Sequence, residues 1–246
     1  MKPFLILQLR PERAVSDDEY AAILAKSGLT ADQTHRICLD HQDLPDPLDL
    51  EAFSGVIVGG GPGCVSDTPE EKTATEARIE AAILSLMPAI TRRDVPFMGC
   101  CYGISVLGHH LGSEVSKRRY SEPVGAVPCR ITPAGRADPL LADLPETMTA
   151  FVGHKEALQE LPAGAVHLME GVACPYQMIR VGQNIYATQF HPEADSDGVA
   201  VRIRAYREKG YFPPETADDL IAATSGADTA DIARILRNFV RHYATG

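Results

Sequence analysis

Cys101 lies in a segment that could present a nucleophile, Gly99-Cys-Cys-Tyr-Gly103. The apolar run ending at Phe97-Met98 predicts a buried strand, and the pattern that follows predicts a helix. A nucleophile on a strand-to-helix turn needs small residues two positions before and after it, because the turn is tight and strained. Glycines hold these positions relative to Cys101 and not to Cys100, so we predict that Cys101 is exposed and that Cys100 points into the core. Cys101 would then stand at the start of the helix, where the helix dipole and free N–H groups favour a thiolate. The alternative is a glycine-bounded turn with two structural cysteines.

A histidine and a carboxylate follow another predicted strand, in the segment His191-Pro192-Glu193. Residues two apart in an extended chain point to the same side, so the imidazole and the carboxylate can meet. Pro192 stiffens the connection and removes an N–H that could compete for the carboxylate. A carboxylate beside a histidine orients the ring and stabilises the imidazolium that forms when a cysteine gives up its proton. Taken alone, this segment could also be an ordinary surface turn.

The glycine-rich run Gly59-Gly-Gly-Pro-Gly63 follows a third predicted strand. The carboxyl ends of parallel strands form the sheet edge where ligands bind, and glycines there let backbone N–H groups approach a developing oxyanion. A dinucleotide-binding loop is disfavoured, because Cys64 replaces the third glycine of that motif and the loop does not follow the first strand. A plain turn is the alternative.

The elements that position these segments alternate between strand and helix. Those predicted before the cysteine are strands at 4–8, 35–39 and 54–58, a helix from Asp17 or Asp18 to about Lys26, and a helix from about residue 70 that ends by Pro88. Runs that are apolar on both faces predict a parallel sheet covered on both sides.

The later part of the chain changes in character. Short strand candidates at 127–131, 148–152, 166–169, 177–181 and 184–190 lie between turns rich in proline and glycine. They predict an antiparallel extension of the sheet. Helices return after Asp195, and the apolar stripe of the last one, about 228–243, predicts core packing. We expect a single domain, 1–246, with extra C-terminal helices from about residue 196.

Composition excludes several classes of function. The formal net charge of −10 argues against nucleic-acid or anionic-membrane binding. The sequence also lacks a long uninterrupted apolar segment of the kind that spans a membrane. Six cysteines without a C-x-x-C pair predict reduced thiols and a cytoplasmic location. His109 and His110 lack usual ligand spacing relative to the cysteine pair, so we expect no metal and no cofactor.

Four motifs taken in order resemble the class I glutamine amidotransferases, most closely their stand-alone, GMP-synthase-like branch. They are Gly59-Gly-Gly-Pro62, Gly99-Cys-Cys-Tyr-Gly103, Gly153-His-Lys155 and Gln189-Phe-His-Pro-Glu193. The resemblance runs from the first strand to about residue 195. It implies a flavodoxin-like three-layer α/β sandwich with a mostly parallel central sheet and an antiparallel extension.

The resemblance also implies a set of site residues. They are the catalytic nucleophile Cys101, the general base and acid His191, its orienting carboxylate Glu193, an oxyanion hole from the backbone N–H groups of Gly61 and Tyr102, and substrate contacts from Gly60, Ser105 and His154. The implied reaction is hydrolysis of the side-chain amide of glutamine through a cysteine thioester, which releases ammonia and glutamate.

One departure bears on the substrate. The family commonly carries glutamine four residues after the nucleophile, where this chain has Ser105, so a free-standing γ-glutamyl peptidase or hydrolase is an alternative. A non-catalytic regulatory member that binds a partner is a second alternative. A thiol hydrolase of another flavodoxin-like family is disfavoured, because Tyr102 stands where that histidine usually follows the nucleophile. The expected partners are the small-molecule substrate and a separate synthetase subunit that would receive ammonia.

Overall fold

The computed structural model describes residues 1–209 and 211–244, so Gly210 and residues 245–246 of the expected domain lie outside the described residues. The strands are β1 (Phe4–Gln8), β2 (Thr34–Cys38), β3 (Gly55–Val58), β4 (Phe97–Cys100), β5 (Val115–Ser116), β6 (Glu122–Ile131), β7 (Thr147–His154), β8 (Ala157–Leu158), β9 (Val166–Glu170), β10 (Met178–Val181) and β11 (Ile185–Thr188). The helices are α1 (Arg13–Ser27), α2 (Ala74–Arg93), α3 (Tyr102–His110), α4 (Pro133–Arg136), α5 (Ser196–Ala205), α6 (Ala217–Thr224) and α7 (Ala230–Tyr243).

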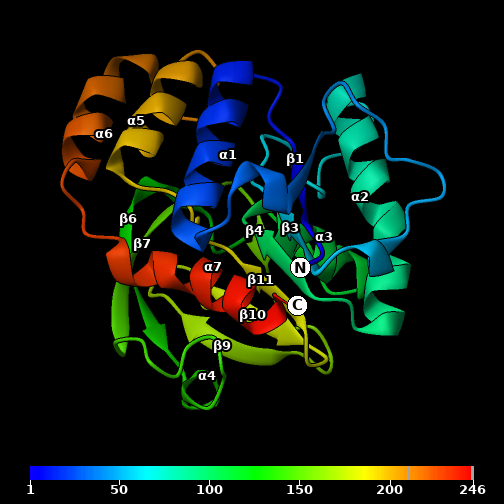
Figure 1. Ribbon diagram of the computed structural model, residues 1–246. Coiled ribbons are helices and arrows are strands. Elements are labelled where there is room, and N and C mark those ends of the chain that lie inside the picture. The colour runs from blue at the N-terminus through cyan, green and yellow to red at the C-terminus, as the bar shows by residue number, and fades with distance from the viewer. Residues whose placement is uncertain (210, 245–246) are drawn as a thin grey trace.

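One sheet organises the molecule, with strands in the order β2-β1-β3-β4-β11-β10-β9-β6-β7 (Figure 1). The first five strands of this order pair in parallel, in the arrangement of flavodoxin-like folds. Every residue of β1, β3 and β4 is buried, as expected for strands covered on both faces. The predicted fold class is confirmed.

The antiparallel extension consists of β10, β9, β6 and β7. The predicted strand at 184–190 does not belong to it in the way the sequence suggested. β11 pairs in parallel with β4 through Ile185–Thr188, and it is antiparallel only to β10. This strand is therefore the last of the parallel half, and its carboxyl end points to the same edge as those of β1, β3 and β4.

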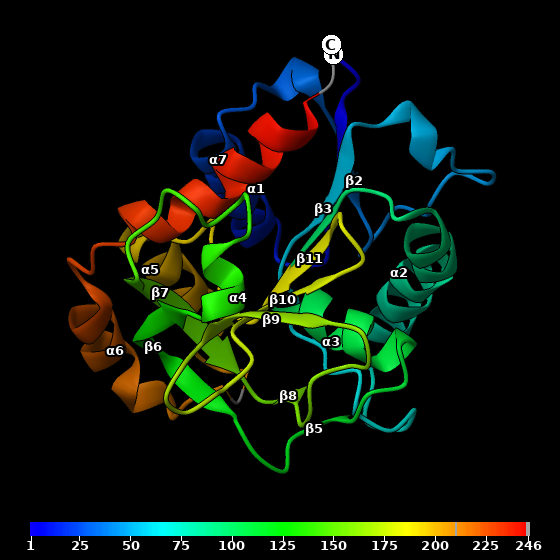
Figure 2. The ribbon, with the colours of Figure 1, turned by 90° about the horizontal axis from the view of Figure 1, so that it is seen from below.

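Helices cover both faces of the sheet (Figures 1 and 2). α1 and α7 lie side by side on one face, where Phe4 and Ile6 of β1 pack with Phe239. α2 and α3 cover the other face, where Leu5 and Leu7 lie among their apolar side chains. α5 and α6 lie beside β6 and β7. The predicted core role of the last helix is confirmed. Among the described residues, no helix combines the length and the apolar character needed to cross a bilayer.

Three predicted helix boundaries are wrong. α1 begins at Arg13, after Glu12, and not at the aspartates that follow. α2 begins at Ala74, because Thr73 and Glu76 form a reciprocal capping box. It also continues through Pro88 to Arg93. A proline inside a helix removes one backbone hydrogen bond, and the buried apolar stripe on both sides of Pro88 holds the helix against the sheet.

Candidate active site

Cys101 occupies a strained turn between β4 and α3. The prediction that it is exposed is wrong, because neighbouring residues leave only 8% of its surface accessible. Its φ of 53° and ψ of −89° lie where residues other than glycine are uncommon, and its N–H donates to the carbonyl of Thr188 at 2.8 Å. A Cβ on Gly99 would lie 2.9 Å from the Cα of Gly103, so the turn cannot close with a larger residue there. Cys100 is fully buried in the core, as predicted, and burial raises the pKa of its thiol.

His191 and Glu193 are in contact beside this turn. The imidazole Nδ1 lies 2.8 Å from Glu193 Oε1, and the backbone N–H of His191 donates to the carbonyl of Phe151 in β7 at 2.9 Å. The antiparallel extension thus holds the end of β11 in place. Arg202 of α5 donates from Nη2 to the same Glu193 oxygen at 3.0 Å.

The charges of this group fix its protonation. Burial alone would lower the pKa of His191, but the charges of Glu193 and Cys101 and their hydrogen bonds outweigh it and raise the pKa to about 9. Burial would raise the pKa of Glu193, but His191 and Arg202 hold it well below its usual range. At neutral pH the imidazole therefore carries a proton and the carboxylate does not.

Two cavities meet at Cys101, and Gly61 lines both of them. The first, the histidine-side cavity, is lined by Arg10, Gly61, Cys101, Val124, Phe151, Val152, Gly153, His191, Val199, Arg202, Ile203, Tyr206, Tyr211 and Phe212. The second, the serine-side cavity, is lined by Gly61, Pro62, Gly63, Cys64, Cys101, Tyr102, Ser105, Gly153, His154, Lys155, Glu156, Gln189 and Tyr211.

The two N–H groups proposed for an oxyanion belong to residues next to the cysteine, one in the chain and one across the cavities. Tyr102 is the first residue of α3, and the first N–H groups of a helix have no acceptor within it. Gly61 belongs to the glycine loop after β3 and lines both cavities with Cys101. Donors in these positions can stabilise negative charge on a carbonyl oxygen that the cysteine attacks.

Gly60 has a different position from the one expected for a substrate contact. Its N–H donates to Oε1 of Glu19 in α1 at 3.2 Å. A Cβ at this residue would lie 2.5 Å from Cε1 of His191 and 2.6 Å from Nη2 of Arg10. The structure therefore places Gly60 against the imidazole, where only a glycine fits, and its N–H is already used.

Ser105 and His154 both line the serine-side cavity. Both ring nitrogens of His154 are engaged, Nε2 with Glu122 Oε2 and Nδ1 with the carbonyl of Glu156, each at 2.9 Å. Ser105 is buried, and the same cavity holds Gln189, whose Oε1 is buried without a partner. Gln189 begins the last of the four sequence motifs but is not among the predicted substrate contacts, although it precedes His191 by two residues and an extended chain places both on one side.

Sequence reasoning also missed a buried charged network behind the imidazole. Glu19 accepts hydrogen bonds from Arg10 Nε at 2.8 Å and from the N–H of Gly60, and Arg202 bonds to Glu193. Arg10 had one available signal, because it follows the first predicted strand at the edge where ligands bind. Glu19 and Arg202 come from helices, and nothing local in the sequence marks them.

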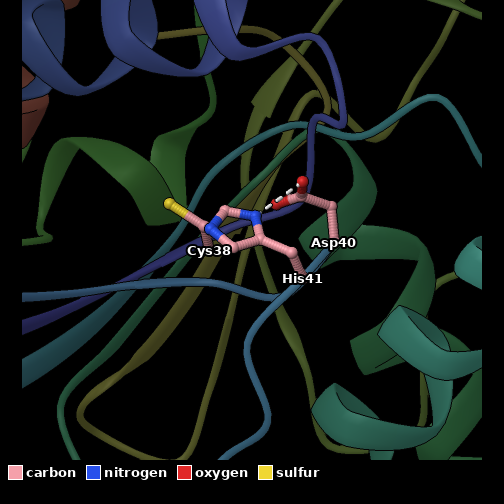
Figure 3. Close-up of side chains that lie close together, drawn as sticks. All are labelled: Cys38, Asp40 and His41. Atoms are coloured by element: carbon pink, nitrogen blue, oxygen red, sulfur yellow. Dashed lines mark hydrogen bonds and ion pairs between the residues drawn. The ribbon is translucent and has the colours of Figure 1, made fainter.

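Two groups among the described residues have metal-ligating side chains close together. Figure 3 shows the first, where the imidazole of His41 lies between the thiol of Cys38 and the carboxylate of Asp40. His41 Nδ1 is 2.8 Å from Asp40 Oδ2, and the histidine is exposed. An ordinary surface hydrogen bond explains this geometry.

The second group is buried and consists of Glu122, His154 and Cys174. Glu122 Oε2 interacts with both His154 and Gln177. Burial, followed by the charge of Glu122, raises the pKa of Cys174 to about 12, so its thiol is protonated and a poor ligand. Hydrogen bonding within the fold accounts for this cluster.

Comparisons with known proteins give a consistent result. The family model for glutamine amidotransferase class-I matches residues 18–200. A GMP synthase [glutamine-hydrolyzing] from Neisseria meningitidis serogroup C is 28% identical over 151 residues, which is 60% of this chain and 26% of that protein. The corresponding enzyme from Bacillus velezensis is 32% identical over 143 residues, 56% of this chain and 24% of that protein. The chain thus spans about a quarter of the length of the curated relatives it matches.

Solved structures share the fold. A glutamine amidotransferase from Thermotoga maritima superposes with a TM-score of 0.72 at 19% identity, covering 100% of both chains. A glutamine amido transferase from Methylobacillus flagellatus superposes with a TM-score of 0.68 at 18% identity, covering 98% of this chain and 95% of the other. At these identities the superpositions establish the shared architecture.

Proposed function

The chain belongs to the class I glutamine amidotransferase family, and we propose that it hydrolyses the side-chain amide of glutamine through a thioester on Cys101. The observation that carries this proposal is the strained Cys101 turn, which shares a cavity with a protonated His191 held by Glu193. A strained nucleophile beside an oriented histidine is the arrangement that acyl transfer needs.

The first half of the reaction forms the acyl-enzyme. The Cys101 thiolate attacks the amide carbon, and the N–H groups of Gly61 and Tyr102 stabilise the negative charge on the oxygen. The imidazolium of His191 donates its proton to the amide nitrogen, the carbon–nitrogen bond breaks, and ammonia leaves. The glutamyl group is then a thioester on sulfur, and His191 is neutral.

The second half returns the enzyme to its starting state. Neutral His191 accepts a proton from water, which attacks the thioester carbon. The carbon–sulfur bond breaks, glutamate leaves, and the thiolate and imidazolium are restored. Glu193 and Arg202 keep the ring in one orientation through both halves, and Ser105 and Gln189 contact the substrate in the serine-side cavity.

The curated relatives are GMP synthases [glutamine-hydrolyzing], and this chain matches about a quarter of their length. We propose that a separate synthetase subunit receives the ammonia. All six cysteines are free thiols, which fits our proposal that the protein works in the cytoplasm.

The test is glutamate release from glutamine by the purified protein and by two neighbouring variants. Cys101→Ala should abolish release, whereas Cys100→Ala, which alters only a core side chain, should retain it. Mass spectrometry after treatment with 6-diazo-5-oxonorleucine should show one adduct on Cys101. Glutamine hydrolysis that persists in Cys101→Ala would overturn the proposal.

A further inference from the structure

The histidine-side cavity is larger than the release of ammonia requires. Its volume is about 60 Å³, several times the roughly 10–15 Å³ that one water-sized group needs on this scale. Ammonia is one such group. The remaining space is bounded by the apolar side chains Val124, Phe151, Val199, Ile203 and Phe212.

His191 identifies which half of a substrate this cavity receives. The residue that protonates a leaving amine must lie on the leaving-group side of the nucleophile. His191 lines this cavity and not the serine-side cavity, whereas Tyr102 and Ser105 line only the latter. The glutamyl part therefore belongs in the serine-side cavity, and the amine part belongs in the histidine-side cavity.

Two buried guanidinium groups offer hydrogen-bond donors at this cavity. Arg202 lines it with only 8% of its surface exposed, and its Nε and Nη1 are buried without a partner. Arg10, 5% exposed, donates from Nε to Glu19 and from Nη1 to Tyr206. Its Nη2 flanks Gly60 together with the imidazole of His191.

These donors indicate an anionic ligand. A buried donor without a partner is costly unless a ligand or water satisfies it, and a guanidinium matches a carboxylate in geometry and charge. No aspartate or glutamate of the described chain lines this cavity. Arg10 is paired with Glu19 and Arg202 with Glu193, so the cavity combines apolar walls with the remaining N–H donors of these guanidinium groups and with the proton donor His191.

We propose that the histidine-side cavity binds the amine half of a γ-glutamyl amide, namely an α-amino acid with an apolar side chain, whose carboxylate is held by Arg202 and Arg10. This inference rests on the proposed acyl transfer to Cys101 and names its substrate class. His191 protonates the nitrogen of the amide, the carbon–nitrogen bond breaks, and the free amino acid leaves in place of ammonia. Water then releases glutamate as before.

The test compares four substrates with the unaltered protein: glutamine, γ-glutamyl-glycine, γ-glutamyl-leucine and γ-glutamyl-leucinamide. We expect kcat/KM for γ-glutamyl-leucine to exceed that for glutamine and for γ-glutamyl-glycine by at least about tenfold, because the apolar walls contact the side chain. We expect the leucinamide, which lacks the negative charge, to be cleaved about 10- to 100-fold less efficiently than γ-glutamyl-leucine.

A variant separates ligand binding from structural support. Arg10→Gln should lower kcat/KM for γ-glutamyl-leucine at least about fivefold more than for γ-glutamyl-leucinamide, whereas a purely structural role would affect both equally. Arg13→Gln is the matched control, because Arg13 is nearby in the chain but exposed and outside the cavity. Should Arg10→Gln fail to fold, the comparison of the four substrates with the unaltered protein still tests whether the cavity binds an apolar amino acid through its carboxylate.

The outcomes distinguish this inference from the proposed function. Cys101-dependent hydrolysis of glutamine with no preference for γ-glutamyl-leucine overturns the inference and leaves the proposed function intact. Equal cleavage of γ-glutamyl-leucine and its leucinamide overturns the assignment of the carboxylate. Cleavage of none of the four substrates, with no adduct on Cys101, overturns both proposals.

Discussion

His191 is the residue whose protonation depends most on its neighbours. Its pKa is raised to about 9 although burial acts in the opposite direction, because Glu193 and Cys101 supply negative charge. Below that pH the ring is an imidazolium that can protonate a leaving amine. The pKa of His191 in the folded protein lies above the usual value of about 6.5. The interaction of the imidazolium with Glu193 therefore stabilises the fold fully below about pH 6.5, and this stabilisation is lost as the pH rises through 9.

We predict that kcat/KM for amide hydrolysis falls as the pH rises through about 9, where His191 loses its proton. In Glu193→Gln the carboxylate charge is absent, so this alkaline limb should move to lower pH, and kcat/KM near neutral pH should fall roughly 10²- to 10⁴-fold. Initial rates between pH 5 and 10.5 for both proteins measure this. An alkaline limb at the same pH in the variant would show that Glu193 does not set the histidine's charge.

At the scale of elements, Glu19 connects α1 to the glycine loop, to the end of β1 at Gln8 and to Arg10, which follows that strand. Its side chain is fully buried, and it accepts hydrogen bonds from Arg10, from the N–H of Gly60 and from Gln8. Removing one partner of such a group leaves an uncompensated buried charge on the other.

We expect Glu19→Ala to lower the free energy of unfolding by about 3–5 kcal/mol, measured by urea denaturation followed by circular dichroism. Asp17→Ala on the same helix is the control, because Asp17 is half exposed and pairs with Arg13 and Arg36 at the surface. It should change the midpoint little. Equal effects of the two substitutions would show that the buried network does not stabilise the fold.

Helices and strands were predictable from the sequence where neighbouring residues determine them, and unpredictable where packing against a residue distant in the chain determines them. The strand at 4–8 matches β1, and the short-range turn around Cys101 was recognisable from its glycines. The end of α2 was not, because Pro88 favours a stop and only packing against the sheet carries the helix to Arg93. In the site, Arg202 reaches Glu193 from a helix, and no periodicity encodes that contact.

Across the whole molecule, the helix at one end of the described chain completes the core begun by the first strand. Phe239 of α7 is fully buried, and its ring centroid lies 6.2 Å from that of Phe4 in β1. Tyr186 of β11 also packs against it. The sheet that carries the site therefore depends on side chains from α7.

We predict that Phe239→Ala lowers the free energy of unfolding by about 3–5 kcal/mol through the cavity it leaves, whereas Arg237→Ala, an exposed residue of the same helix, changes it little. Urea titration of both variants measures this. Glutamine hydrolysis by the fraction that is still folded should be retained, because Phe239 lines neither cavity. A small loss of stability in Phe239→Ala would show that α7 is not part of the cooperative core.

The packing of α7 on β1 also sets an order of events during synthesis on the ribosome. Phe4 and Ile6 leave the ribosome more than two hundred residues before Phe239, one of their apolar partners. Because domains fold as units when their sequence becomes available, one face of the parallel sheet is covered by α1 but not by α7 until residues 230–243 have left the exit tunnel. The surroundings of Cys101 are therefore completed late, after His191, Arg202 and α7 have all been made.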